Sequence, residues 1–149
     1  MTGSAEPSWR DIWITVRDGI RIYGRHYPAP GSRRRPVLCL AGLTRNSRDF
    51  HVLASELSGD GEAARPVYTM DCRGRGLSDH AASWRDYAVP IEAFDVQDFM
   101  ASQHLHDAAI VGTSRGGIIT MVLGALQPAL VGPVVLNDIG PVIDREGLL

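Results

Sequence analysis

Lysine is absent from this sequence of 149 residues, and all fifteen of its basic residues are arginine. A Walker A loop needs a lysine that reaches the nucleotide phosphates. A Schiff base, including the one formed with pyridoxal phosphate, needs a lysine amine. The sequence therefore excludes both kinds of site.

His104 and His106, next to Asp107, are better explained as a solvated helix end than as metal ligands. No cofactor or metal is predicted.

The sequence also contains few cysteines and no excess of positive charge. The only two cysteines, Cys39 and Cys72, are too few for a disulfide framework, and Cys39 lies in an apolar run that predicts a small buried residue. The formal net charge at pH 7 is −2. Because there is no basic surplus for a polyanion, neither nucleic acid nor a membrane surface is an expected partner. A small-molecule substrate is favoured instead.

No apolar run is long enough to cross a bilayer, which needs about 20 residues. The most apolar stretch, Gly116–Leu126, is much shorter, and residues 1–11 lack the apolar centre of a signal peptide. We therefore expect a cytoplasmic protein. Residues 1–8 are predicted to be a flexible tail, and residues 9–149 a single domain.

The apolar periodicity predicts an α/β fold. Strands are expected at 11–16, 20–27, 37–40, 66–70, 108–111 and 131–136, and helices at 48–58, 91–104 and 115–126. The first two strands flank Asp18-Gly19 and predict an antiparallel hairpin. The alternation that follows predicts a mostly parallel sheet with helices on both faces. Ligands of such sheets bind beyond the carboxyl ends of the strands, so four turns need inspection.

The third of these turns, Val111–Gly117, contains Gly-x-Ser-x-Gly between a predicted strand and a predicted helix. This context is the one that a nucleophile elbow requires. Ser114 would adopt a strained backbone conformation that presents its hydroxyl, and Gly112 and Gly116 would leave room for the crossing. The start of the helix would direct the Arg115 N–H toward developing negative charge.

The other three turns are less specific. The first, Leu40–Asn46, follows a buried strand, and the Leu43 N–H is its best second donor to an oxyanion. The second, Met70–Asp79, has only part of a phosphate-binding glycine pattern and favours a structural loop held by Asp and Arg pairs. In the fourth, Leu136–Pro141, Asp138 could orient a catalytic His or could cap its own turn.

Together, these four turns resemble the α/β-hydrolase family, from about Trp9 to the end of the sequence. The resemblance implies that Ser114 is the nucleophile and that the Leu43 and Arg115 amides form the oxyanion hole. It points to the branch that cleaves esters, lactones or carbon–carbon bonds through an acyl-enzyme. Ala41 replaces a His that is frequent in the first turn of this family. The oxyanion donor there is a backbone group, so we expect the hole to be preserved.

One member of the family's triad has no counterpart. The triad runs Ser, then Asp or Glu, then His along the chain, and no His follows Ser114. The resemblance implies that the chain stops where a cap domain would begin. It leaves two origins for the acid, Asp138 or a residue after the next strand. We therefore expect this chain alone to be inactive. The alternative is a non-catalytic module that binds small ligands.

The last predicted strand has a further consequence. If the sheet ends there, Val134–Leu136 becomes an edge strand that is patterned for burial and has no Lys or Pro to block pairing. We expect either self-association through this edge or pairing with a second chain.

Overall fold

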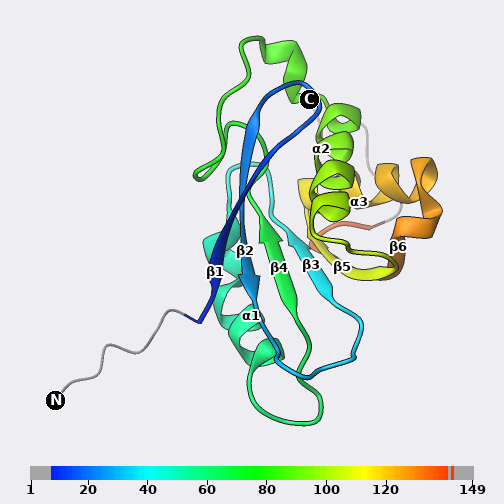
Figure 1. Cartoon of the computed structure of the whole chain (residues 1–149). Helices are drawn as coiled ribbons and strands as arrows, with labels where there is room; N and C mark the ends of the chain where they lie inside the picture. Colours follow the sequence, from blue (N-terminus) through cyan, green and yellow to red (C-terminus); the bar gives the residue numbers. More distant parts are fainter. Residues whose placement is uncertain (1–7, 141, 143–149) are drawn as a thin grey trace, which may run out of the picture.

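The computed structural model describes residues 8–140 and residue 142, and it contains six strands and three α-helices in this part (Figure 1). The predicted tail lies outside the described residues, except for its last residue. The strands are β1 (Arg10–Thr15), β2 (Arg21–Tyr27), β3 (Val37–Leu40), β4 (Val67–Met70), β5 (Ala108–Thr113) and β6 (Val131–Asn137). The helices are α1 (His51–Ser58), α2 (Val89–Ser102) and α3 (Arg115–Leu126). Three 3-10 turns are η1 (Ser47–Phe50), η2 (Trp84–Tyr87) and η3 (Pro128–Leu130).

The six strands form one sheet in the order β1-β2-β4-β3-β5-β6. The predicted hairpin is confirmed, because β1 and β2 pair antiparallel from Arg10 opposite His26 to Thr15 opposite Arg21. Strand β2 also pairs antiparallel with β4, whereas β4, β3, β5 and β6 are parallel neighbours. The carboxyl ends of β3, β5 and β6 therefore lie side by side at one edge of the sheet.

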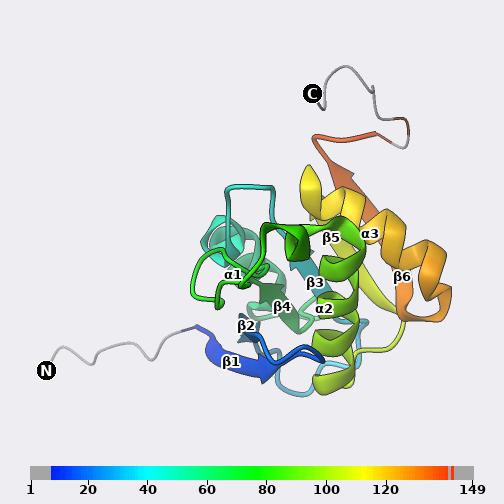
Figure 2. The same ribbon diagram turned by 90° about the horizontal axis from the view of Figure 1, so that it is seen from above.

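Helices cover both faces of the sheet, as predicted. Viewed from above, α1 lies on one face and α2 and α3 lie on the other (Figure 2). Strand β3 is buried on both sides: Leu38 and Leu40 join the core under α2 and α3, and Val37 and Cys39 join the core under α1. Such two-sided burial accounts for the continuous apolar run of a central parallel strand.

The predicted edge position of Val134–Leu136 is confirmed within the described sheet, where β6 is the last strand. The side chains of Val134 and Val135 are 41% and 59% exposed. The strand is longer than predicted and includes Pro133, and a register shift relative to β5 precedes Val134. The shift places the irregular Gly132-Pro133 step before the segment that pairs regularly, so the Pro leaves the pairing of Val134–Leu136 intact.

Among the residues that the structure places, no helix is both long enough and apolar enough to cross a membrane. The same residues contain no group of three or more His, Cys, Asp or Glu side chains arranged to hold a metal ion.

Candidate active site

Ser114 lies at the junction of β5 and α3 in a backbone conformation that is rare for a residue with a side chain. Its φ is 49° and its ψ is −114°. Conformations of this kind cost about 1–3 kcal/mol and persist only where the surrounding fold enforces them. The strained turn that Gly-x-Ser-x-Gly predicts is therefore present, and Ser114 is half-buried at the carboxyl end of the sheet.

The two glycines of the motif enforce this geometry by close packing. A Cβ atom on Gly116 would lie 2.2 Å from the carbonyl oxygen of Leu40, so α3 touches the backbone at the end of β3. A Cβ on Gly112 would lie 2.8 Å from the carbonyl oxygen of Gly116. Any side chain at either position would separate strand and helix. The glycines thus have the role that the sequence predicts.

The two amides predicted to form an oxyanion hole belong to Arg115, the residue after Ser114, and to Leu43 in the loop after β3. The N–H of Arg115 is the first of α3, where a helix leaves its N–H groups unpaired. In the described part of the chain, neither this N–H nor that of Leu43 donates a hydrogen bond to another residue. A Cβ on Gly42 would lie 3.6 Å from the Cβ of Ser114, so the loop after β3 reaches the serine. Binding of an oxyanion by these amides stays a prediction.

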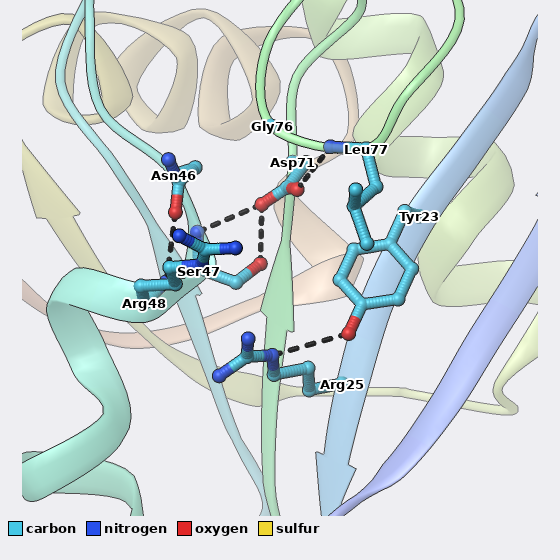
Figure 3. A pocket seen from close by; sticks show the side chains of 8 residues that line it. All are labelled: Tyr23, Arg25, Asn46, Ser47, Arg48, Asp71, Gly76 and Leu77. Atoms are coloured by element: carbon cyan, nitrogen blue, oxygen red, sulfur yellow. Dashed lines mark hydrogen bonds between the residues drawn. The ribbon is translucent and has the colours of Figure 1, made fainter.

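The loop after β4 is held by Asp and Arg side chains, which confirms its interpretation as a structural loop. The buried carboxylate of Asp71 accepts hydrogen bonds from the N–H and hydroxyl of Ser47, at 2.7 and 2.5 Å, and from the N–H of Leu77 at 2.9 Å (Figure 3). Asp71 therefore ties the segment that follows the Leu43 loop to the end of β4. Arg73 pairs with Asp95 on α2, and both are buried.

A hollow of about 190 Å³ adjoins Asp71. The side chains of Arg25 and Arg48 are among those that line it (Figure 3). The guanidinium of Arg25 is buried and donates to the hydroxyl of Tyr23 at 3.1 Å. It also stacks over the ring of Trp9 at 4.3 Å. Aromatic rings thus account for the placement of this arginine.

Asp138, the acid candidate, follows β6 in a left-handed conformation with φ 55° and is exposed. The N–H of Ser114 donates to the carbonyl of the preceding Asn137 at 2.9 Å, so the turn that carries Asp138 adjoins the elbow. No hydrogen bond within the described residues joins a His ring to the Ser114 hydroxyl. The sequence-based assignment of Asp138 is therefore left as a prediction.

Cysteine is not the nucleophile of this site. Cys72 is buried in the loop after β4, and burial raises the pKa of its thiol to about 12. Burial likewise raises the pKa of Cys39 to about 12, in agreement with its predicted role as a buried apolar residue. Both thiols are protonated at neutral pH, and a protonated thiol is a poor nucleophile.

A second hollow, of about 370 Å³, adjoins the elbow on the α1 face of the sheet. Its wall is mostly apolar and is formed by the loop after β3, the start of α1 and the ends of β5 and β6. The lining residues are Ala41, Gly42, Asp49, Phe50, Leu53, Val111, Thr113, Val135 and Asn137. A mostly apolar hollow that includes Thr113, the residue before Ser114, suits a small organic substrate.

Sequence reasoning missed one buried charged residue of this region. Glu92 lies on α2 with an exposed fraction of 0% and contacts the side chains of Arg75 and Arg115. Its only signal in the sequence is its position on the same helical face as the buried Val96 and Phe99, where an unpaired charge would be unfavourable.

Comparison with known proteins shows which protein family the chain belongs to. The sequence profile of the alpha/beta hydrolase fold matches residues 35–146. The chain therefore belongs to the alpha/beta hydrolase fold family, as its four turns predict.

Two curated proteins and one solved structure are among those similar to this chain. The chain is 38% identical over 138 residues to the 3-hydroxybutyrate-oligomer hydrolase of Cupriavidus necator, which covers 93% of this chain and 46% of that protein. It is 32% identical over 107 residues to ethanol acetyltransferase 1 of Cyberlindnera jadinii. That match covers 72% of this chain and 30% of the acetyltransferase. A solved alpha/beta hydrolase of Novosphingobium aromaticivorans superposes with a TM-score of 0.84 at 41% identity, over 95% of this chain and 48% of that one. The chain spans less than half the length of each.

Proposed function

We propose that this chain carries the nucleophile and the oxyanion hole of a serine hydrolase. The observation that carries the proposal is the backbone of Ser114, held at φ 49° and ψ −114°. The N–H groups of Leu43 and Arg115, which donate no hydrogen bond within the described residues, support it. A strained serine is maintained at the carboxyl edge of the sheet although a relaxed turn would be more stable. Membership of a hydrolase fold family supports a catalytic reason for that strain.

In the proposed reaction, the Ser114 oxygen attacks an acyl carbonyl carbon, and a His that lies outside this sequence accepts the serine proton. The Leu43 and Arg115 amides bind the oxyanion. Collapse of the intermediate expels the alcohol, which takes the proton from the His, and leaves an acyl-enzyme that water hydrolyses. Asp138 is proposed as the acid that orients the His.

We propose a small ester or lactone as the substrate, with an acyl carbon–carbon bond as a further option of the same chemistry. The apolar hollow beside the elbow suits a short acyl group. Two relatives support acyl transfer by their names, one a hydrolase of 3-hydroxybutyrate oligomers and one an ethanol acetyltransferase. Linear dimers and trimers of 3-hydroxybutyrate are therefore the first substrates to assay.

The test is covalent labelling of the complete gene product with a fluorophosphonate probe. We expect rapid labelling that Ser114→Ala abolishes, because the probe reacts with an activated serine. Labelling that persists in Ser114→Ala would contradict the assignment of the nucleophile. Ser102→Ala, at the far end of α2 and outside both the elbow and the apolar hollow, is the control and is expected to keep its label.

The same assay examines Asp138. If Asp138 orients the His, Asp138→Asn slows labelling by several orders of magnitude, as loss of a triad acid lowers kcat by roughly 10⁴. An unchanged rate would restrict Asp138 to capping its turn.

A second candidate function is a module that binds small apolar ligands without turnover. A complete gene product without a His downstream of Ser114 would favour it. It predicts ligand binding in the apolar hollow with no labelling of Ser114 in the complete gene product.

A further inference from the structure

Glu92 connects the two segments that flank Ser114. It lies in the first turn of α2, and its carboxylate is completely buried. One oxygen, Oε1, accepts a hydrogen bond from Nη1 of Arg75. The other, Oε2, accepts from Nε of Arg115 at 2.8 Å. A single carboxylate thus holds two arginines, one from the loop after β4 and one from the first turn of α3.

Each arginine in turn fixes one of the proposed oxyanion donors. Nε of Arg75 donates to the carbonyl oxygen of Leu43 at 2.5 Å and so holds the residue that supplies one of the two proposed N–H donors. Arg115 supplies the other N–H itself, and its Nη2 also donates to the carbonyl of Tyr87 at 2.5 Å. The side chain of Arg115 is therefore anchored at two points, while its backbone N–H has no acceptor among the residues that the structure describes.

We propose that Glu92 is the positioning residue of the oxyanion hole, because its two carboxylate oxygens set the separation of the Leu43 and Arg115 amides through Arg75 and Arg115. The inference rests on the proposed function, since it needs an oxyanion to bind. Glu92 touches neither Ser114 nor substrate in this arrangement. Its effect on the reaction passes entirely through the two arginines.

Charge explains why a carboxylate is required here. All three side chains have little access to water. Glu92 is fully buried, and the side chains of Arg75 and Arg115 are 15% and 21% exposed. A buried carboxylate with two guanidinium partners satisfies both of its oxygens by charge-assisted hydrogen bonds. The cluster keeps one net positive charge next to the elbow, which favours a negative transition state. A Gln could accept at one oxygen only, and its NH₂ group would face a guanidinium donor.

The experiment compares Glu92→Gln with Asp95→Asn in the complete gene product. Asp95 is a matched control, since it lies on α2 three residues from Glu92 and its carboxylate is also buried, in an ion pair with Arg73 at 2.6 Å. Both variants lose a buried ion pair and should unfold at lower urea concentration. Only Glu92→Gln should lower kcat, by about 10- to 100-fold, somewhat less than direct loss of an oxyanion donor.

Two further measurements separate positioning from general destabilisation. KM of Glu92→Gln should stay within about threefold of wild type, because the lost interaction acts in the transition state. Affinity for a trifluoromethyl ketone, which binds as an oxyanion, should fall by the same factor as kcat/KM. Arg75→Gln, at a partly exposed residue, should also lower kcat, and its effect should not add to that of Glu92→Gln because both break one connection.

The outcomes are distinct. A fall in kcat and in ketone affinity that is confined to the Glu92 and Arg75 variants supports the inference. An equal fall in Asp95→Asn, or unchanged kinetics in both Glu92→Gln and Arg75→Gln, would overturn it while wild-type labelling at Ser114 left the proposed function intact. A wild-type protein that fluorophosphonate does not label would overturn the proposed function, and this inference with it.

Discussion

At the scale of single residues, the exclusive use of arginine has a structural counterpart in the loop after β4. Arg73 is 1% exposed and donates to both oxygens of Asp95, at 2.7 and 2.6 Å. A planar guanidinium can make this paired contact, and an ammonium group cannot. The hydrogen bond to Asp95 holds the pKa of Arg73 above its ordinary value. The charge is thus retained although burial opposes it.

His26 provides a residue-level prediction about pH. It lies on β2, where its ring stacks on Tyr68 with centroids 4.4 Å apart. Burial, aided by the charge of Arg10, lowers the pKa of His26 below the ordinary 6.5. As the pH falls, His26 therefore takes up a proton in the unfolded chain before it does so in the folded protein. The contribution of neutral His26 to the unfolding free energy is complete above about pH 6.5 and decreases below it. Urea unfolding of wild type and His26→Gln at pH 5 and pH 7.5 should show a weaker pH dependence for the variant.

The matched control for this experiment is His106→Gln, because His106 is exposed. It should retain the pH dependence of wild type. If His26→Gln lost stability between the two pH values as steeply as wild type, His26 would not be the group responsible.

At the scale of elements, periodicity located the helices and strands, and α3 and β3 have the predicted bounds. The predicted helix 48–58 is divided into η1 and α1, which a hydrophobic pattern cannot distinguish from one helix. The order of the strands in the sheet cannot be predicted in the same way, because no local sequence pattern indicates that β4 lies between β2 and β3. The proposed role of Glu92 could not be predicted for the same reason, because it depends on two arginines, at positions 75 and 115, that only the fold brings together.

Two glycines of α3 yield an element-level prediction. Gly116 packs against the end of β3, where a Cβ would lie 2.2 Å from the Leu40 oxygen and 2.9 Å from the Ala41 oxygen. Backbone atoms cannot rotate away, so Gly116→Ala should separate α3 from β3 and lower the unfolding free energy by about 1–3 kcal/mol or more. Urea unfolding measures this loss, and fluorophosphonate labelling at Ser114 should slow in parallel.

Gly124 on the same helix is the matched control. A Cβ there would have nothing within 4 Å. Gly124→Ala should therefore stabilise the protein by about 0.5–1 kcal/mol, because alanine loses less backbone entropy in a helix. Equal effects of the two substitutions would show that helix propensity, and not the contact with β3, governs position 116.

At the scale of the whole molecule, the two edges of the sheet differ in character. Strand β1 presents the exposed, charged Arg10 and Asp11. Strand β6, at the opposite edge (Figure 2), presents Val134 and Val135. Val135 also lines the apolar hollow with Val111 and Leu53. An apolar edge with free backbone groups is a template for another strand, whereas charged edges resist pairing. We therefore expect the assembly of the molecule to depend on which strand, if any, pairs with β6.

We accordingly propose that the 149-residue chain, produced alone, self-associates through β6. Sedimentation velocity should give a weight-average mass that rises above 16.2 kDa with concentration. Val135→Lys places a charge that would have to be desolvated in the paired state, so it should weaken association by at least about tenfold, or roughly 1.4 kcal/mol. Thr15→Lys makes the matched change at the β1 edge and should leave association unchanged. A monomer at all concentrations, or equal weakening by both substitutions, would contradict pairing at β6. A second polypeptide that co-purified with the chain and suppressed this association would instead identify the strand that covers β6.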